Sequence, residues 1–111
     1  MINDLPVSPH FKLREFQCRC CASVKLCPRL LERLEALRAA WGRPIVITSG
    51  YRCDSRNKAV GGAIRSLHLR GMAADIAAPE REQPRLRELA GIIGFSEIIP
   101  GGSRNYLHVA D

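Results

Sequence analysis

The sequence predicts an α+β fold: a small, mainly antiparallel sheet with helices packed on one side. Three observations lead to this prediction. The chain has 111 residues, which fits a single domain over residues 1–111. Residues 28–41 repeat apolar side chains at helical spacing. Four short apolar or β-branched runs are typical of strands, at 44–48, 72–78, 95–99 and 105–110.

Residues 1–27 form an irregular, cysteine-containing leading segment, because Pro6 and Pro9 interrupt any periodicity. Its "FKLREF" stretch predicts one short helical turn. A helix then follows over 28–41, with Pro28 at a first helical position and Gly42 ending it. One apolar stripe runs along this helix: Leu30, Leu31, Leu34, Leu37 and Trp41.

The rest of the chain alternates short strands and helices. "PIVIT" at 44–48 predicts a strand buried on both faces, and a short helix over 54–60 ends at a glycine pair. "MAADIAA" at 72–78 predicts a second strand. A helix starting near Pro84 and ending at Gly91 or Gly94 precedes two strands that "PGG" joins as a hairpin.

Charge and composition indicate which classes of binding partner to expect. Seventeen Lys and Arg against eleven Asp and Glu give a net charge of +6, which favours polyanions such as bacterial wall polymers. The cations are scattered and aromatic residues make up only 5%, so we expect no nucleic-acid partner. No apolar run is long enough for a membrane span. The opening residues lack signal-peptide features, so we expect synthesis in the cytoplasm and release to the cell wall.

Five cysteines lie at positions 18, 20, 21, 27 and 53. The run "CRCCASVKLC" is compatible with a disulfide knot, a small structural zinc site, or reduced thiols. It does not match paired CxxC knuckles, so we favour structural cysteines over a second, cysteine-bound zinc ion.

His68, Asp75 and His108 are the candidate metal ligands. In the last predicted strand His108 alternates with Leu107 and Val109, so it points to the open face of the sheet if those two face the core. Asp75 lies among alanines, where a carboxylate needs a partner or a metal. Two imidazoles and a carboxylate are a standard zinc set that leaves one position for water, whose pKa zinc lowers to about 7. Alternatively, His68 and His108 are structural histidines, and Asp75 forms an ion pair with an arginine.

Arg52 follows a strand and a glycine turn, so we expect it to lie on the same rim as His68. Its guanidinium could hold a peptide carboxylate by two hydrogen bonds or stabilise an oxyanion. A surface ion pair is the alternative role.

"ITSGYRCDSRNKAVGGAIRSLHLRGMAADI" and "YLHVAD" resemble motifs of the zinc D-Ala-D-Ala carboxypeptidase and L-alanyl-D-glutamate endopeptidase family. These peptidoglycan peptidases share a fold with lysostaphin-type enzymes and the hedgehog signalling domain. The resemblance covers roughly residues 45–111. It implies one catalytic zinc ion held by His68, Asp75 and His108. It also implies a substrate-anchoring Arg52, with Ser66 and Tyr51 beside it.

One position departs from the family pattern. Many members have an Asp or Glu three residues before the final histidine as general base, and this chain has Asn105, which cannot take a proton. Glu97, on a neighbouring predicted strand, is our first candidate for the base. Asp111 is the second, although its odd spacing from His108 points to the opposite face.

We therefore predict a monomeric zinc peptidase that hydrolyses stem-peptide amides next to D-amino acids. It would act as a DD-carboxypeptidase or an LD-endopeptidase, and a phage or prophage endolysin fits this description. The main alternative, which Asn105 motivates, is a non-catalytic zinc-bearing domain that binds the cell wall or a peptide. A polyanion-binding protein with cysteine-held zinc is a third.

Overall fold

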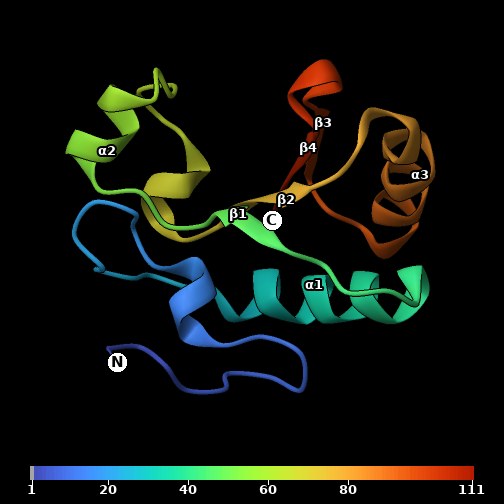
Figure 1. The fold of residues 1–111 in the computed structure, drawn as a ribbon, viewed down its shortest axis with the longest axis horizontal. Coiled ribbons are helices and arrows are strands. Elements are labelled where there is room, and N and C mark those ends of the chain that lie inside the picture. The colour runs from blue at the N-terminus through green and yellow to red at the C-terminus, as the bar shows by residue number, and fades with distance from the viewer. Residues whose placement is uncertain (1) are drawn as a thin grey trace.

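The computed structural model describes residues 2–111 and shows an α+β fold (Figure 1). Within residues 2–111, three α-helices and four strands follow one another, with short 3₁₀ turns between them. The order is α1 (Pro28–Trp41), β1 (Ile47–Ser49), α2 (Asp54–Ala59), β2 (Ala73–Ala77), α3 (Gln83–Ile93), β3 (Glu97–Pro100) and β4 (Tyr106–Ala110). The 3₁₀ turns are η1 (Leu13–Phe16), η2 (Leu67–Arg70), η3 (Glu80–Glu82) and η4 (Gly102–Arg104).

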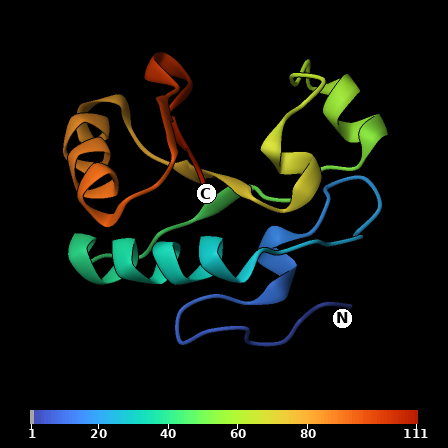
Figure 2. The ribbon, with the colours of Figure 1, turned by 180° about the vertical axis from the view of Figure 1, so that it is seen from behind.

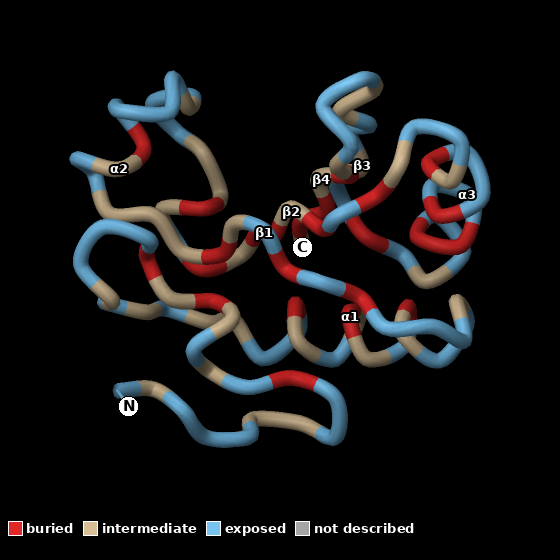
Figure 3. The backbone as a smooth tube through the Cα atoms, viewed as in Figure 1, coloured by how far each residue is buried: buried red, intermediate tan, exposed pale blue. Residues whose placement is uncertain are grey.

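The four strands form one antiparallel sheet in the order β1-β2-β4-β3. Side chains alternate across the two central strands, so Ile76 of β2 and Leu107 of β4 enter the core. Asp75 and His108, their neighbours in sequence, point to the other face. Buried residues accordingly recur along these strands in Figure 3.

Helices α1 and α3 cover the core face of the sheet (Figures 1 and 2). The stripe of α1 buries Leu30, Leu34 and Leu37, while α3 buries Leu86 and Ala90 in the same cluster. Complete removal of such aliphatic side chains from water contributes about 1.5–3 kcal/mol each. Burial therefore fixes the sheet against these helices and leaves its other face free for the polar side chains.

The helix predicted over 28–41 is confirmed, and so is the antiparallel α+β fold. The predicted burial of strand 44–48 on both faces is wrong. The strand begins at Ile47, and Val46 is 58% exposed. Because β1 is an edge strand with one face toward the core, only Ile45 and Ile47 are buried.

The predicted hairpin between the last two strands contains more than a tight turn. The 3₁₀ turn η4 lies between β3 and β4, and Asn105 closes it in the left-handed conformation, with φ of 59°. None of the helices in residues 2–111 has the length and apolar character that crossing a bilayer requires.

Candidate active site

A cleft of about 190 Å³ opens on the sheet face opposite the core. Seven side chains from five segments line it: Arg52, Ser66, His68, Asp75, Ile99, Tyr106 and His108. A larger hollow of about 440 Å³ lies near Gln83 and Arg87, but its lining contains no histidine or cysteine. The smaller cleft is therefore the candidate site.

The strand register brings Asp75 and His108 together. The two residues are direct partners across the antiparallel β2–β4 pair, and Nδ1 of His108 lies 3.0 Å from Oδ1 of Asp75. Directly opposite side chains on one face are neighbours in any antiparallel ladder. The alternation predicted from Leu107 and Val109 is thus what places His108 in the cleft.

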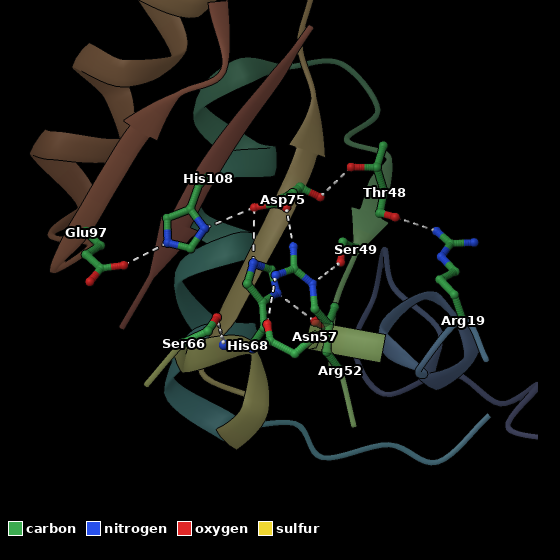
Figure 4. Close-up of polar contacts among 11 residues, drawn as sticks. Arg19, Thr48, Ser49, Arg52, Asn57, Ser66, His68, Asp75, Glu97 and His108 are labelled. Carbon is green, nitrogen blue, oxygen red and sulfur yellow. Dashed lines mark hydrogen bonds and ion pairs between the residues drawn. The ribbon is translucent and has the colours of Figure 1, made fainter. Parts of the chain in front are cut away.

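His68 reaches the same point from η2. Ser66 is the N-cap of this turn, and its Oγ accepts a hydrogen bond from the His68 backbone N–H at 3.2 Å. The imidazole is only 2% exposed. Its Nδ1 donates to the carbonyl of Gly50 at 2.7 Å, and its Nε2 lies 3.2 Å from Oδ1 of Asp75 (Figure 4).

Asp75 is the electrostatic centre of the cleft. Burial alone would raise the pKa of its carboxyl group, but hydrogen bonds to His108 and His68 outweigh burial and hold that pKa well below its usual range. Arg52 adds a third contact, from Nη2 to Oδ2 at 3.2 Å. The Asp75 carboxylate is therefore ionised at neutral pH.

His108 lies between two carboxylates. Its Nδ1 faces Asp75, and its Nε2 lies 2.8 Å from Oε1 of Glu97, which is 47% exposed at the rim (Figure 4). Burial lowers the pKa of His108, but the hydrogen bonds to Asp75 and Glu97 exceed this effect and raise the pKa above its ordinary value.

The donor set fits a divalent cation such as zinc. The Gly50 carbonyl can only accept, which assigns the proton of neutral His68 to Nδ1 and leaves a lone pair on Nε2 facing Asp75. Lone pairs that face each other repel unless a proton or a metal ion lies between them. Ligand atoms of His68, Asp75 and His108 all lie within 4.8 Å of one another. This geometry suits three-ligand zinc binding with outer hydrogen bonds that orient the imidazoles.

Arg52 lies beside this group, as the sequence predicts. Its guanidinium donates to Ser49 Oγ at 3.1 Å and to Asn57 Oδ1 at 3.3 Å, in addition to Asp75. A Cβ at Gly62 would lie 2.0 Å from Asn57 Oδ1, so glycine there leaves room for this network. Arg52 thus forms an ion pair with Asp75, and it also lines the cleft.

The other predicted site residues divide into two groups. Ser66 lines the cleft and Glu97 reaches its rim. Tyr51 does not line it, and its ring instead lies 5.7 Å from Nζ of Lys25. Asp111 does not reach the cleft either, because its carboxylate is 7% exposed and pairs with two arginines of α1, Arg29 and Arg33.

Asn105 occupies the position where many members of the resembling family have an acid. Its Oδ1 accepts from the backbone N–H of Glu80 at 3.1 Å, and its carbonyl accepts from Ala78. Asparagine tolerates the left-handed conformation found here better than most residues. The side chain therefore stabilises the turn before β4.

Two lining residues were absent from the predicted site, Tyr106 and Ile99. Tyr106 shares the open face with His108, so strand alternation could have identified it. Ile99 is the β3 partner of His108, a relationship that depends on the register between the strands.

Comparison with known proteins agrees with this geometry. The sequence model of the family described as Peptidase M15 matches residues 9–110. One similar curated protein is the Zinc D-Ala-D-Ala carboxypeptidase of Streptomyces albus G, with 40% identity over 82 residues. The match covers 70% of this chain and 32% of that relative, so the chain spans about a third of the relative's length.

Proposed function

Because the chain belongs to the peptidase M15 family, we propose that it is a zinc-dependent peptidase that hydrolyses amide bonds of peptidoglycan stem peptides. One observation carries the proposal: His68, Asp75 and His108 converge within 4.8 Å in a cleft that Arg52 also lines. The name of the Streptomyces relative supports both zinc and a D-Ala-D-Ala substrate.

His68, Asp75 and His108 would hold the zinc ion, through Nε2, Oδ1 and Nδ1 respectively. Zinc in such a site polarises an amide carbonyl and makes water a stronger acid. The carbonyl of Gly50 fixes the tautomer of His68, and the carboxylate of Glu97 accepts the Nε2 proton of His108. Both contacts orient the imidazoles for the metal before substrate arrives.

Glu97 remains our candidate for the general base, and its contact with His108 supports a positioning role as well. Its Oε1 contacts the nitrogen of His108 that faces away from Asp75. A base must come within about 2.6–3.2 Å of the proton it removes, directly or through one water. The half-exposed carboxylate has a second oxygen available for that purpose.

Arg52 would recognise the substrate. Its Nη2 contacts the Asp75 oxygen Oδ2 rather than the Oδ1 that both histidines share, so the guanidinium lies beside the metal position. A free terminal carboxylate is the strongest partner for a guanidinium, which favours carboxypeptidase action. Binding of an internal carbonyl instead would favour endopeptidase action.

The test is digestion of defined muropeptides with the zinc-loaded protein, followed by mass spectrometry. Loss of one terminal alanine identifies a DD-carboxypeptidase, and separation of alanine from glutamate within the stem identifies an LD-endopeptidase. Clearing of purified cell walls would support the lysis role. Intact muropeptides after prolonged incubation with saturating zinc would reject hydrolysis.

Asn105 favours a second candidate, a zinc-bearing domain that binds wall peptides without cutting them. Its amide cannot accept a proton, and it is committed to the turn before β4. This candidate predicts saturable binding of stem peptides with no product. Binding without turnover in both the original protein and Glu97→Gln would favour it.

A further inference from the structure

We propose that Cys18, Cys20, Cys21 and Cys53 form a second metal site, which holds a structural zinc ion. The site is separate from the His68, Asp75 and His108 group and does not depend on the proposed function. The four Sγ atoms lie within 4.8 Å of one another. Three cysteines come from the loop after η1, and Cys53 comes from the N-cap of α2.

The spacing of the sulfur atoms suits a tetrathiolate site. Cys18 Sγ lies 3.5 Å from Cys20 Sγ and 3.6 Å from Cys53 Sγ, and Cys20 Sγ lies 3.3 Å from Cys53 Sγ. Zn–S bonds of about 2.3 Å in a tetrahedron put the sulfurs about 3.8 Å apart. A small outward movement of the Cys18, Cys20 and Cys53 sulfurs would bring them to this spacing, and Cys21 Sγ lies within 4.8 Å of all three.

The contacts do not correspond to a disulfide framework. A disulfide joins two sulfurs at about 2.05 Å, and all five cysteines are free. Here Cys18, Cys20 and Cys53 each have two sulfur neighbours at nearly equal distance. Such a closed group is the arrangement that a shared ion requires, whereas disulfides pair sulfurs exclusively.

Backbone N–H groups around the cluster point at the cysteine sulfurs. The backbone N–H of Cys53 donates to Cys18 Sγ, and that of Arg56 donates to Cys53 Sγ, each at 3.5 Å. Backbone hydrogen bonds close the loop: the Cys18 N–H donates to the Ser23 carbonyl at 2.7 Å, and the Ala22 N–H donates to the Cys18 carbonyl at 3.0 Å. N–H groups directed at sulfur orient and stabilise metal-bound thiolates.

The position of Cys53 gives the site a structural role. Cys53 directly follows Arg52, whose backbone N–H donates to the carbonyl of His68 at 3.1 Å. A metal ion at the four sulfurs would therefore tie the leading segment to the loop that places Arg52 and His68. The cysteine site would support the cleft without taking part in hydrolysis.

The four clustered cysteines are not the four that lie together in the sequence. Cys27 belongs to the run "CRCCASVKLC", but it is the N-cap of α1 and its N–H donates to the carbonyl of Gly71. Cys53, which is distant in sequence, takes the fourth place. Cys27 is therefore a matched control within the same chain.

Cobalt(II) substitution of the reduced protein tests the site. Cobalt bound by several thiolates gives an intense ultraviolet charge-transfer band that a site of histidines and a carboxylate lacks. We expect this band in the original protein and in His68→Ala, which removes a ligand from the other site. We expect zinc content to fall from two ions per chain to one in His68→Ala.

The variants then assign the ligands. Cys20→Ser combined with Cys53→Ser should abolish the band and release one zinc ion, whereas Cys27→Ser should retain both. If the double variant does not fold, the spectrum of His68→Ala still decides the question. Absence of the band from His68→Ala, its loss in Cys27→Ser, or disulfides detected by mass spectrometry in protein saturated with zinc would overturn the proposal.

Discussion

Nε2 of His108 lies 2.8 Å from Oε1 of Glu97, while the other ring nitrogen faces the proposed metal position. The contact makes Glu97 an outer partner of a ligand, which is a different position from that of a base touching the substrate. Outer partners of metal ligands typically contribute 10- to 100-fold to affinity or activity, whereas a general base contributes about 100- to 10,000-fold. These ranges allow the two roles of Glu97 to be separated.

We expect Glu97→Ala to weaken zinc binding about 10- to 100-fold, because His108 loses its acceptor. Glu97→Gln should retain most of the zinc affinity, because its amide oxygen still accepts from Nε2. Zinc titration with a competing chelator measures the affinity, and kcat at saturating zinc measures turnover. A loss of kcat of at least about 100-fold in Glu97→Gln with zinc retained would assign the base. If zinc affinity is unchanged in Glu97→Ala, the positioning role is wrong.

Arg52→Lys should retain the positive charge and lose the forked contacts to Ser49, Asn57 and Asp75. A hydrogen bond to a charged group contributes about 1.5–3 kcal/mol, so we expect kcat/KM to fall about 10- to 100-fold. If Arg52 binds the terminal carboxylate, the loss should disappear for a substrate amidated at that end. Arg43→Lys, on a surface pair with Glu82, is the control. Equal losses on both substrates would contradict carboxylate recognition.

The metal-free protein should lose stability on both sides of a window of mildly acidic pH. The raised pKa of His108 stabilises the fold below about pH 6.5, and this contribution is lost as pH rises through the raised value. The lowered pKa of Asp75 stabilises the fold above about pH 3.8, and this contribution is lost as pH falls through the lowered value.

Thermal unfolding of metal-free protein across pH measures this window. His108→Gln should remove the loss of stability on the alkaline side. Zinc should reverse it in the original protein, because the ligands bind metal only when deprotonated. A melting temperature that falls equally above pH 6.5 in the original protein and His108→Gln would contradict the assignment to His108.

Gly71→Ala should destabilise the protein more than Gly61→Ala. Both glycines have positive φ, 68° and 71°, which costs an alanine about 1–2 kcal/mol. A Cβ at Gly71 would also lie 2.2 Å from the backbone oxygen of Lys25, whereas nothing lies within 4 Å at Gly61. Crowding of this kind adds about 1–3 kcal/mol. Denaturant unfolding measures both free energies, and equal losses would contradict the proposed contact.

Local sequence patterns predict the parts of this fold that depend on local physics. The stripe of α1, its proline start and its glycine end are all visible within residues 28–42. The alternation of Leu107, His108 and Val109 correctly predicts which face His108 occupies. These features depend on periodicity, so they require no knowledge of distant contacts.

The remainder depends on contacts between distant segments. Glu97 meets His108 because β3 pairs with β4, and Asp111 pairs with Arg29 and Arg33 because the residue after β4 lies beside α1. The fourth cysteine of the cluster, Cys53, comes from beyond β1. Sequence spacing identifies the residue types available for such contacts, but only the packed fold selects the partners.

Restoration of hydrolysis by zinc tests the central claim most directly. The metal-free protein is mixed with increasing zinc, and alanine release from a stem peptide ending in D-Ala-D-Ala is measured beside the same titration of Asp75→Asn. We predict no turnover without metal, turnover that rises to saturation with zinc, and none in Asp75→Asn at the same zinc concentrations. Full turnover in the metal-free protein, or equal turnover in Asp75→Asn, would contradict the claim that His68, Asp75 and His108 hold the catalytic ion.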